Sequence, residues 1–177
     1  MISGGIFGPK LSGKTTLAIE LSKAYWRRVR WRSLVLDINA QDWGPQAWAT
    51  VDEAQFWPLV WKTQNCLVIV DDASATIRRE RELIPVFTRL RHCQHKLLVI
   101  GHSGIDLLPT MRQQLDRLYL FRQPEDAALL WARTFTDDRL LQAVTLRQFE
   151  FLAASMYGDC ERCRLKWRKT GLHRETV

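Results

Sequence analysis

The stretch Gly8-Pro9-Lys10-Leu11-Ser12-Gly13-Lys14-Thr15 decides the fold of this chain. It has the pattern Gly-x4-Gly-Lys-Thr of a phosphate-binding loop, whose backbone N–H groups close around a phosphate where glycines leave room. Residues 2–7 are predicted to form a short buried strand before the loop, and residues 16–28 an amphipathic helix after it. The strand, loop and helix together predict a nucleoside triphosphate as the ligand.

The loop residues have separate expected roles. Lys14 is expected to reach the β- and γ-phosphates of ATP, and Thr15 to hold Mg²⁺ through its hydroxyl. The expected nucleotide-binding residues are Gly8, Pro9, Lys10, Leu11, Ser12, Gly13, Lys14, Thr15 and Thr16.

Apolar runs along the chain predict further strands that are covered on both faces, as in a parallel sheet. These runs lie at residues 33–38, 66–70, 96–100 and 117–122. Segments with helical periodicity lie between or after them, at residues 52–63, 78–93, 107–115, 125–134, 137–143 and 145–157, and residues 42–50 are predicted as a turn. Together with the phosphate loop, the alternation predicts an α/β fold of the P-loop NTPase class (RecA-like, ASCE), with a central mostly parallel sheet flanked by helices.

We expect one ATPase domain over residues 1–158 and a basic C-terminal tail over residues 159–177. The tail is expected to lack fixed structure until it meets a partner.

Two acidic residues, Asp71 and Asp72, follow the apolar run 66–70 directly. This pattern is typical of a Walker B strand, which ends opposite the phosphate loop. Asp71 is expected to hold Mg²⁺ together with Thr15, and Asp72 to orient and polarise a water for attack on the γ-phosphate. The alternative for Asp72 is a helix cap for the segment that follows.

The run 96–100 leads into His102 and Ser103. Motor-type P-loop proteins place such a strand between the Walker B strand and the loop strand, so His102 or Ser103 is a candidate sensor of the γ-phosphate; a purely structural histidine is the alternative. Arg89 and Arg91 are candidates for an arginine that reaches a neighbouring subunit's site, against the alternative of ordinary surface residues. The candidate catalytic residues are therefore Lys14, Asp72, Arg89, Arg91, His102 and Ser103.

The charge of the chain indicates a polyanionic partner in addition to the nucleotide. Its 177 residues carry a net charge of +7. The cations form three clusters, and solvated surface is the alternative for each: Lys23, Arg27, Arg28, Arg30 and Arg32; Arg78, Arg79, Arg81, Arg89 and Arg91; Arg162, Arg164, Lys166, Arg168 and Lys169. Trp26 and Trp31 interleave with the first cluster, although core packing explains them equally well.

No window approaches the roughly 20 apolar residues of a membrane span, so we expect a soluble, cytoplasmic protein without a transmembrane segment. Its four cysteines are expected to be reduced. Cys160 and Cys163 are spaced as two zinc ligands, but a structural zinc site needs two more ligands, so a pair of reduced thiols is the other interpretation.

Several elements after Asp72 resemble one protein family. They are residues 87–92 (Phe-Thr-Arg-Leu-Arg-His), 97–103 (Leu-Leu-Val-Ile-Gly-His-Ser), 108–112 (Leu-Pro-Thr-Met-Arg) and 118–121 (Leu-Tyr-Leu-Phe). Over about residues 1–125 the chain resembles the genome-packaging ATPases of tailless icosahedral viruses with internal membranes, the tectivirus and poxvirus-type branch of the FtsK–HerA superfamily. One departure concerns the sensor strand, which ends in His102-Ser103 where the family often has Ser-Gln.

The resemblance implies a ring-forming motor, usually a hexamer, that hydrolyses Mg-ATP to drive double-stranded DNA into a preformed capsid. It implies capsid-vertex or membrane proteins of the virion as partners, and the host cytoplasm and the packaging vertex as locations. By position, Lys14, Thr15 and Asp71 correspond to the Mg-ATP ligands, Asp72 to the residue that polarises water, and Arg89 or Arg91 to the arginine acting in the neighbouring site.

Two other functions fit parts of the sequence. A small-molecule or nucleotide kinase has a similar length and loop, but the chain has no clear Arg-rich lid segment. A filamentous-phage export ATPase is a third possibility, although such proteins usually carry a membrane span.

Overall fold

The computed structural model describes residues 3–72, 89–168 and 171–176. Its strands are β1 (Gly4–Phe7), β2 (Ser33–Leu36), β3 (Ala47–Thr50), β4 (Leu67–Val70), β5 (Lys96–Gly101), β6 (Arg117–Phe121), β7 (Glu150–Ser155), β8 (Cys160–Arg168) and β9 (Gly171–Thr176). Its α-helices are α1 (Lys14–Val29), α2 (Glu53–Lys62), α5 (Pro109–Arg112) and α6 (Glu125–Phe135). Shorter 3-10 segments are η2 (Leu90–Cys93), η3 (Gly104–Asp106) and η4 (Asp138–Thr145).

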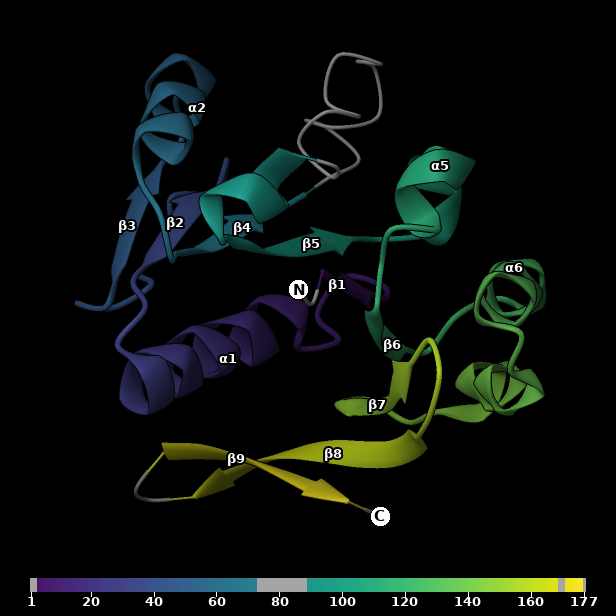
Figure 1. Ribbon diagram of the computed structural model, residues 1–177. Helices are drawn as coiled ribbons and strands as arrows, with labels where there is room; N and C mark the ends of the chain where they lie inside the picture. The colour runs from purple at the N-terminus through teal and green to yellow at the C-terminus, as the bar shows by residue number, and fades with distance from the viewer. Residues whose placement is uncertain (1–2, 73–88, 169–170, 177) are drawn as a thin grey trace.

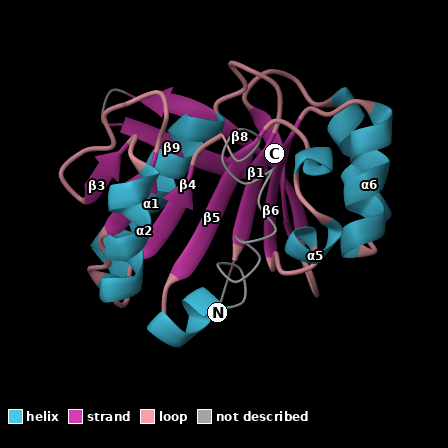
Figure 2. Ribbon diagram, turned by 90° about the horizontal axis from the view of Figure 1, so that it is seen from above, coloured by secondary structure: helices cyan, strands magenta, loops and turns pink. Residues whose placement is uncertain are grey.

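All the strands of the described residues join one sheet in the order β3-β2-β4-β5-β1-β6-β7-β8-β9. The part from β3 to β6 is parallel, and β7, β8 and β9 extend it in antiparallel fashion. Strand β5 lies between β4 and β1, as predicted for a strand that follows Walker B. Figure 2 shows β5 and β1 near the middle of the sheet, with α2 at one side and α6 at the other.

Two apolar layers hold the helices against the sheet. On one face, α2, α5 and α6 pack on the strands through residues such as Phe56, Met111 and Trp131. On the other face, α1 contributes Leu17 and Ala18 to a layer that also contains residues of β7 and β8 (Figure 1). The layer on the α6 side reaches the phosphate loop's own strand, because the rings of Trp131 and Phe7 lie 4.7 Å apart between centroids.

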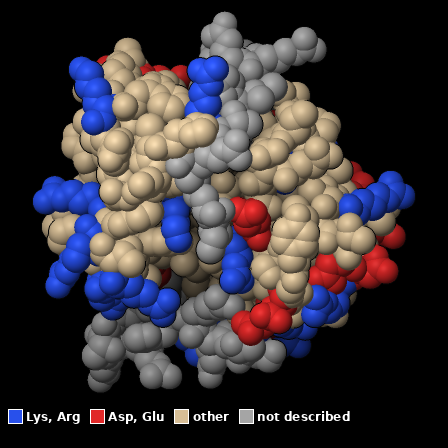
Figure 3. All heavy atoms as spheres, in the orientation of Figure 1, with Lys and Arg blue, Asp and Glu red and all other residues tan. Residues whose placement is uncertain are grey.

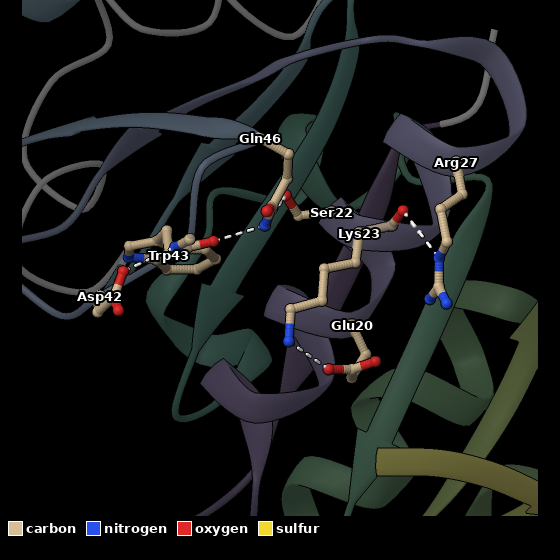
Figure 4. A network of polar contacts seen from close by, with 8 residues as sticks. Glu20, Ser22, Lys23, Arg27, Asp42, Trp43 and Gln46 are labelled. Carbon is tan, nitrogen blue, oxygen red and sulfur yellow. Dashed lines mark hydrogen bonds and ion pairs between the residues drawn. The ribbon is translucent and has the colours of Figure 1, made fainter. Parts of the chain in front are cut away.

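A buried polar network ties the start of β3 to α1 (Figure 4). The Gln46 side-chain amide donates to the Ser22 hydroxyl and to the Trp43 carbonyl, and the Ser22 hydroxyl lies 2.7 Å from that of Ser33. Asp37, at the end of β2, accepts the indole N–H of Trp43 at 2.8 Å. These contacts satisfy polar groups that would otherwise be costly to bury at the edge of the sheet.

Two predictions about secondary structure were wrong. Residues 42–50 do not form only a turn, because they contain the edge strand β3, which pairs in parallel with β2. Residues 145–157 contain β7 instead of a helix, because this segment pairs on one side with β6 and on the other with β8. Packing within the sheet thus overrides the helical preference of Leu152, Ala153 and Ala154.

The segment after residue 158 also differs from the expected tail without fixed structure. Residues 160–168 and 171–176 form a hairpin, and its first strand pairs with β7 along Glu150–Ala154. The expected boundary between 158 and 159 therefore falls in the connection between two paired strands. The helix predicted over 78–93 lies mostly outside the described residues, and its last part, Leu90–Cys93, is the 3-10 segment η2.

Candidate nucleotide site

The phosphate loop joins β1 to α1 as predicted, and its glycines occupy positions that other residues would disturb. A Cβ on Gly8 would lie 2.5 Å from the Cβ of Phe121, and Gly13 has a φ of 102°. Between them, Leu11 is exposed with a φ of 60°, while the Ser12 hydroxyl is buried and has no hydrogen-bond partner among the described residues. The tight turn and the unsatisfied hydroxyl fit a loop built to surround a phosphate group.

Lys14 begins α1, and its ammonium lies inside the loop. The Nζ atom donates to the Pro9 carbonyl at 2.9 Å. Burial lowers the pKa of Lys14, whereas the nearby carboxylates of Asp71 and Asp72 act in the opposite direction. The lysine is therefore placed between the phosphate loop and the acidic end of β4, where it could contact terminal phosphates.

The residue that ends the phosphate-loop motif contacts the residue that follows the Walker B strand. The Thr15 hydroxyl donates to Oδ2 of Asp71 at 3.1 Å. Burial raises the pKa of Asp71, and the negative charge of Asp37 adds to this effect, while hydrogen bonds from the Asp72 N–H and from Thr15 oppose it. A buried carboxylate beside a threonine hydroxyl is a donor pair that suits Mg²⁺. Thr15 and Asp71 thus fit the predicted metal site.

Asp72 lies next to this pair. Its backbone N–H donates to Oδ1 of Asp71 at 2.8 Å, its φ is 51°, and its side chain is half-buried. Its carboxylate is close enough to Lys14 to oppose the lowering of that lysine's pKa. The segment that Asp72 would cap in the alternative interpretation lies outside the described residues.

The predicted sensor residues lie at the end of β5, beside the strand that leads into the phosphate loop. The Gly8 N–H donates to the Gly101 carbonyl at 3.3 Å, which joins the two strand ends. The Ser103 hydroxyl accepts the Ile105 N–H at 3.3 Å and so caps η3. A hydroxyl that accepts one hydrogen bond can still donate its own proton, so Ser103 keeps a donor for a phosphate.

A pocket of about 630 Å³ opens next to this strand end. Pro9, His102 and Ser103 line it on the side of the phosphate loop, and Arg122, Gln123 and Asp126 on the side of α6. The Gln123 amide donates to the His102 carbonyl at 3.1 Å, which fixes the two sides relative to each other. The pocket could receive a ligand group adjacent to the phosphates.

The two candidate arginines do not lie at this end of the sheet. Arg89 is exposed, and Arg91 belongs to η2, whose chain leads into the opposite, amino-terminal end of β5 at Lys96. The length of β5, about 16 Å from Lys96 to Gly101 at about 3.3 Å per residue, separates the ends of that strand. The backbone at Arg89 and Arg91 thus lies toward the end of β5 opposite to the phosphate loop.

Some residues around the site were missed in the sequence. Gln148 donates from its side chain to the Leu11 carbonyl at 3.3 Å, and a Cβ on Gly13 would lie 2.7 Å from Cδ1 of Leu165 and 3.3 Å from Cδ1 of Phe149. These contacts come from the chain before β7 and from β8. No motif signals them, because they depend on how β7 and β8 join the sheet.

The structure shows the state of the cysteines and the length and apolar character of the described helices. All four cysteines are free thiols, and the described residues contain no group of three or more His, Cys, Asp or Glu side chains arranged to hold a metal ion. Throughout the same ranges, every helix falls short of the length and apolar character needed to span a bilayer.

Known proteins resemble this chain in three-dimensional structure, whereas comparisons with family models and curated proteins find no match. The genome packaging NTPase B204 from Sulfolobus turreted icosahedral virus 2, solved with AMPPCP, matches with a TM-score of 0.75 and 16% identity, over 91% of this chain and 96% of that chain. B204 from Sulfolobus Turreted Icosahedral Virus, described as its DNA-packaging ATPase, matches with a TM-score of 0.72 and 16% identity over the same shares, 91% and 96%.

A more distant match is the KaiC-like protein PH0186 from Pyrococcus horikoshii OT3. Its TM-score is 0.63 and its identity 8%, over 98% of this chain and 89% of that chain. At such identities the likeness is one of fold. The match to B204 confirms, at that level, the resemblance to viral genome-packaging ATPases, and the chain has the P-loop NTPase fold that its sequence predicted.

Proposed function

We propose that this protein is an ATPase motor that works in a ring oligomer and moves double-stranded DNA into a preformed viral capsid. The observation that carries the proposal is the shared fold with B204, a genome packaging NTPase, over 91% of the chain. B204 from Sulfolobus turreted icosahedral virus 2 has also been solved with ATP-gammaS, which supports a nucleoside triphosphate as the ligand of this loop too.

In the proposed reaction, Lys14 leaves the Pro9 carbonyl and binds the β- and γ-phosphates of ATP. Thr15 and Asp71 would hold Mg²⁺, which would neutralise phosphate charge. Asp72, next to Asp71 at the end of β4, orients and polarises the attacking water. His102 or Ser103 contacts the γ-phosphate from the end of β5 and reports its loss.

The proposed ring would give the two candidate arginines a site to act on. The path of η2 into the far end of β5 supports a role for Arg89 or Arg91 in the site of another copy. An arginine supplied in this way stabilises charge in the transition state and increases the rate by roughly 10³ to 10⁵. In this proposal hydrolysis depends on assembly, and the expected ring is a hexamer. The ring acts at the packaging vertex of the virion, which it reaches from the host cytoplasm.

The experiment is a measurement of ATP hydrolysis over a range of protein concentrations, with and without double-stranded DNA. We expect the rate per chain to rise with protein concentration and to change when DNA is added. Lys14→Ala should remove hydrolysis at every concentration. A rate per chain that is independent of both concentration and DNA would contradict the motor.

One observation favours a second candidate, a P-loop kinase for a small molecule. The pocket of about 630 Å³ beside Pro9 and Ser103 has room for a phosphate acceptor, and Arg122 lines it. A kinase would transfer phosphate at full rate as a monomer when the acceptor is present. Phosphorylation of a small acceptor by dilute protein would therefore favour the kinase, whereas slow release of inorganic phosphate alone would count against it.

A further inference from the structure

A cluster of cations gathers where α1 ends, away from the phosphate loop. We call it the basic patch and define it as Arg27, Arg28, Arg30, Arg32, Lys96 and Arg117. In Figure 3, Lys and Arg atoms gather at the lower left, over the carboxyl-terminal end of α1, while acidic atoms lie nearer the centre and the right. Three elements build the patch: the end of α1 with the connection to β2, the first residue of β5 and the first residue of β6.

Aromatic rings hold several of these cations in place. The guanidinium carbons of Arg30 and Arg32 both lie 5.7 Å from the centroid of the Trp26 ring. The Lys96 ammonium lies 5.1 Å from the ring of Tyr25 and 5.8 Å from that of Trp31. Cation–π contacts of this kind restrain long side chains before a ligand arrives, so less conformational entropy is lost when it binds.

Direct ion pairs do not neutralise this charge within the described ranges. No residue of the basic patch forms an ion pair there, and the sequence from Leu21 to Leu36 contains no acidic residue. Arg27 donates through Nε to the Lys23 carbonyl at 3.3 Å, which leaves its terminal nitrogens for another acceptor (Figure 4). The cluster on β8 differs, because Arg162 is paired with Glu150 at 2.6 Å.

The kinds of side chain indicate what the basic patch binds. Arginines dominate it, and the planar guanidinium group matches the oxygens of a phosphate in two-point contacts. The Trp26 ring already carries two guanidinium groups, and the Trp31 and Tyr25 rings lie against Lys96, so these rings are engaged with cations instead of being open to bases. A strand that stacks its bases on aromatic rings is therefore disfavoured relative to a duplex that presents its phosphates.

We propose that the basic patch binds the phosphodiester backbone of double-stranded DNA. The choice of DNA as the polyanion rests on the proposed function, whereas the binding surface itself does not depend on ATP hydrolysis. Helix α1 runs for 16 residues from Lys14, or about 24 Å at about 1.5 Å per residue, so the basic patch lies well away from the nucleotide. Contact with DNA at this surface and catalysis at the loop can thus be tested separately.

The test compares Arg28→Gln/Arg32→Gln with the native protein for binding of a short mixed-sequence duplex, without nucleotide, across a salt series. Each phosphate contact contributes about 0.9 to the slope of log affinity against log salt, which is about eightfold in affinity near 0.1 M salt. The double variant should thus bind about sixtyfold more weakly and lose about 1.8 from the slope. Its hydrolysis of ATP in the absence of DNA should equal that of the native protein.

Arg133→Gln is the control for loss of an arginine elsewhere, because Arg133 is an exposed arginine on α6 outside the basic patch. It should leave duplex affinity nearly unchanged, and thermal unfolding checks that all variants are folded. Equal binding by the double variant and the native protein, or an equal loss in Arg133→Gln, would overturn the proposal. So would tighter binding of single-stranded DNA, or of polyglutamate as an acidic protein mimic, than of the duplex. If the basic patch binds duplex but DNA never alters hydrolysis, the result contradicts the motor function and still supports this surface as a DNA-binding site.

Discussion

Replacement of Gly13 by alanine tests how the phosphate loop is packed against the last part of the chain. Gly13 combines a φ of 102° with a position at which a new Cβ would lie 2.7 Å from Cδ1 of Leu165. A non-glycine residue with positive φ costs about 1–2 kcal/mol, and forcing a methyl group into a packed site costs about 1–3 kcal/mol more. We therefore expect Gly13→Ala to lower the free energy of unfolding by about 2–5 kcal/mol.

The second contribution depends on one neighbour, so a double-mutant cycle can isolate it. Leu165 is 3% exposed, and Leu165→Ala alone should cost about 2–5 kcal/mol. In Gly13→Ala/Leu165→Ala the new methyl group no longer meets a leucine side chain. The loss of unfolding free energy in the double variant should thus be about 1–3 kcal/mol smaller than the sum of the losses in the two single variants.

The assay is urea unfolding of the four proteins, followed by circular dichroism. Gly158→Ala serves as the control, because its Cβ would meet only the Ser155 hydroxyl at 2.9 Å, the end of a short exposed turn, and the change should stay within about 0.5 kcal/mol. Additive effects of Gly13→Ala and Leu165→Ala would show that β8 does not press on the loop. A fully stable Gly13→Ala would refute both parts of the argument.

Three further predictions concern the candidate site and its support. Burial raises the folded-state pKa of Asp71, so its protonated carboxyl stabilises the fold at pH values below the ordinary pKa of 3.8, and this stabilisation is lost as pH rises through the folded-state pKa. Asp71→Asn should thus be more stable than the native protein at neutral pH, but inactive. Thermal unfolding measured from acid to neutral pH should show that the stabilities of the two proteins converge in acid. Trp43→Phe removes the 2.8 Å hydrogen bond to Asp37 and should cost about 1.5–3 kcal/mol in urea unfolding, whereas Trp48→Phe at the exposed edge should cost under about 0.5 kcal/mol; equal effects would contradict the role given to Asp37. Arg89→Ala and Arg91→Ala should abolish hydrolysis and leave nucleotide binding nearly intact, and normal turnover in both variants would rule out an arginine shared between subunits.

The parallel half of the fold could be predicted because its signals are local. Each buried strand is a short apolar run, and the glycines and Lys14 of the loop identify the nucleotide site without any tertiary information. The approach of Asp71 to Thr15 also follows from sequence, since parallel strands with this order bring their carboxyl ends to one edge. The contacts at that edge are therefore encoded in motifs.

The antiparallel half could not be predicted in the same way. All residues from Phe151 to Ala154 are buried, so β7 lacks the alternation of apolar and polar positions that marks a half-exposed strand. In β8 this alternation is present, with Cys163 and Leu165 buried and Arg164 and Lys166 exposed. The abundance of charge there indicated a solvated tail, and only the pairing with β7 turns the alternation into a strand.

Trp131 gives α6 a mechanical connection to the end of the sheet that holds the nucleotide site. Its ring packs on Phe7, at the entry to the phosphate loop, and a Cβ on Gly104, just after the candidate sensor, would lie 2.6 Å from it. A rigid, fully buried indole wedged between these points leaves no slack to absorb a shift of either one. We therefore expect a displacement of the loop after β5 to move α6 as well, and a pair of spectroscopic labels, one of them on α6, would detect this movement.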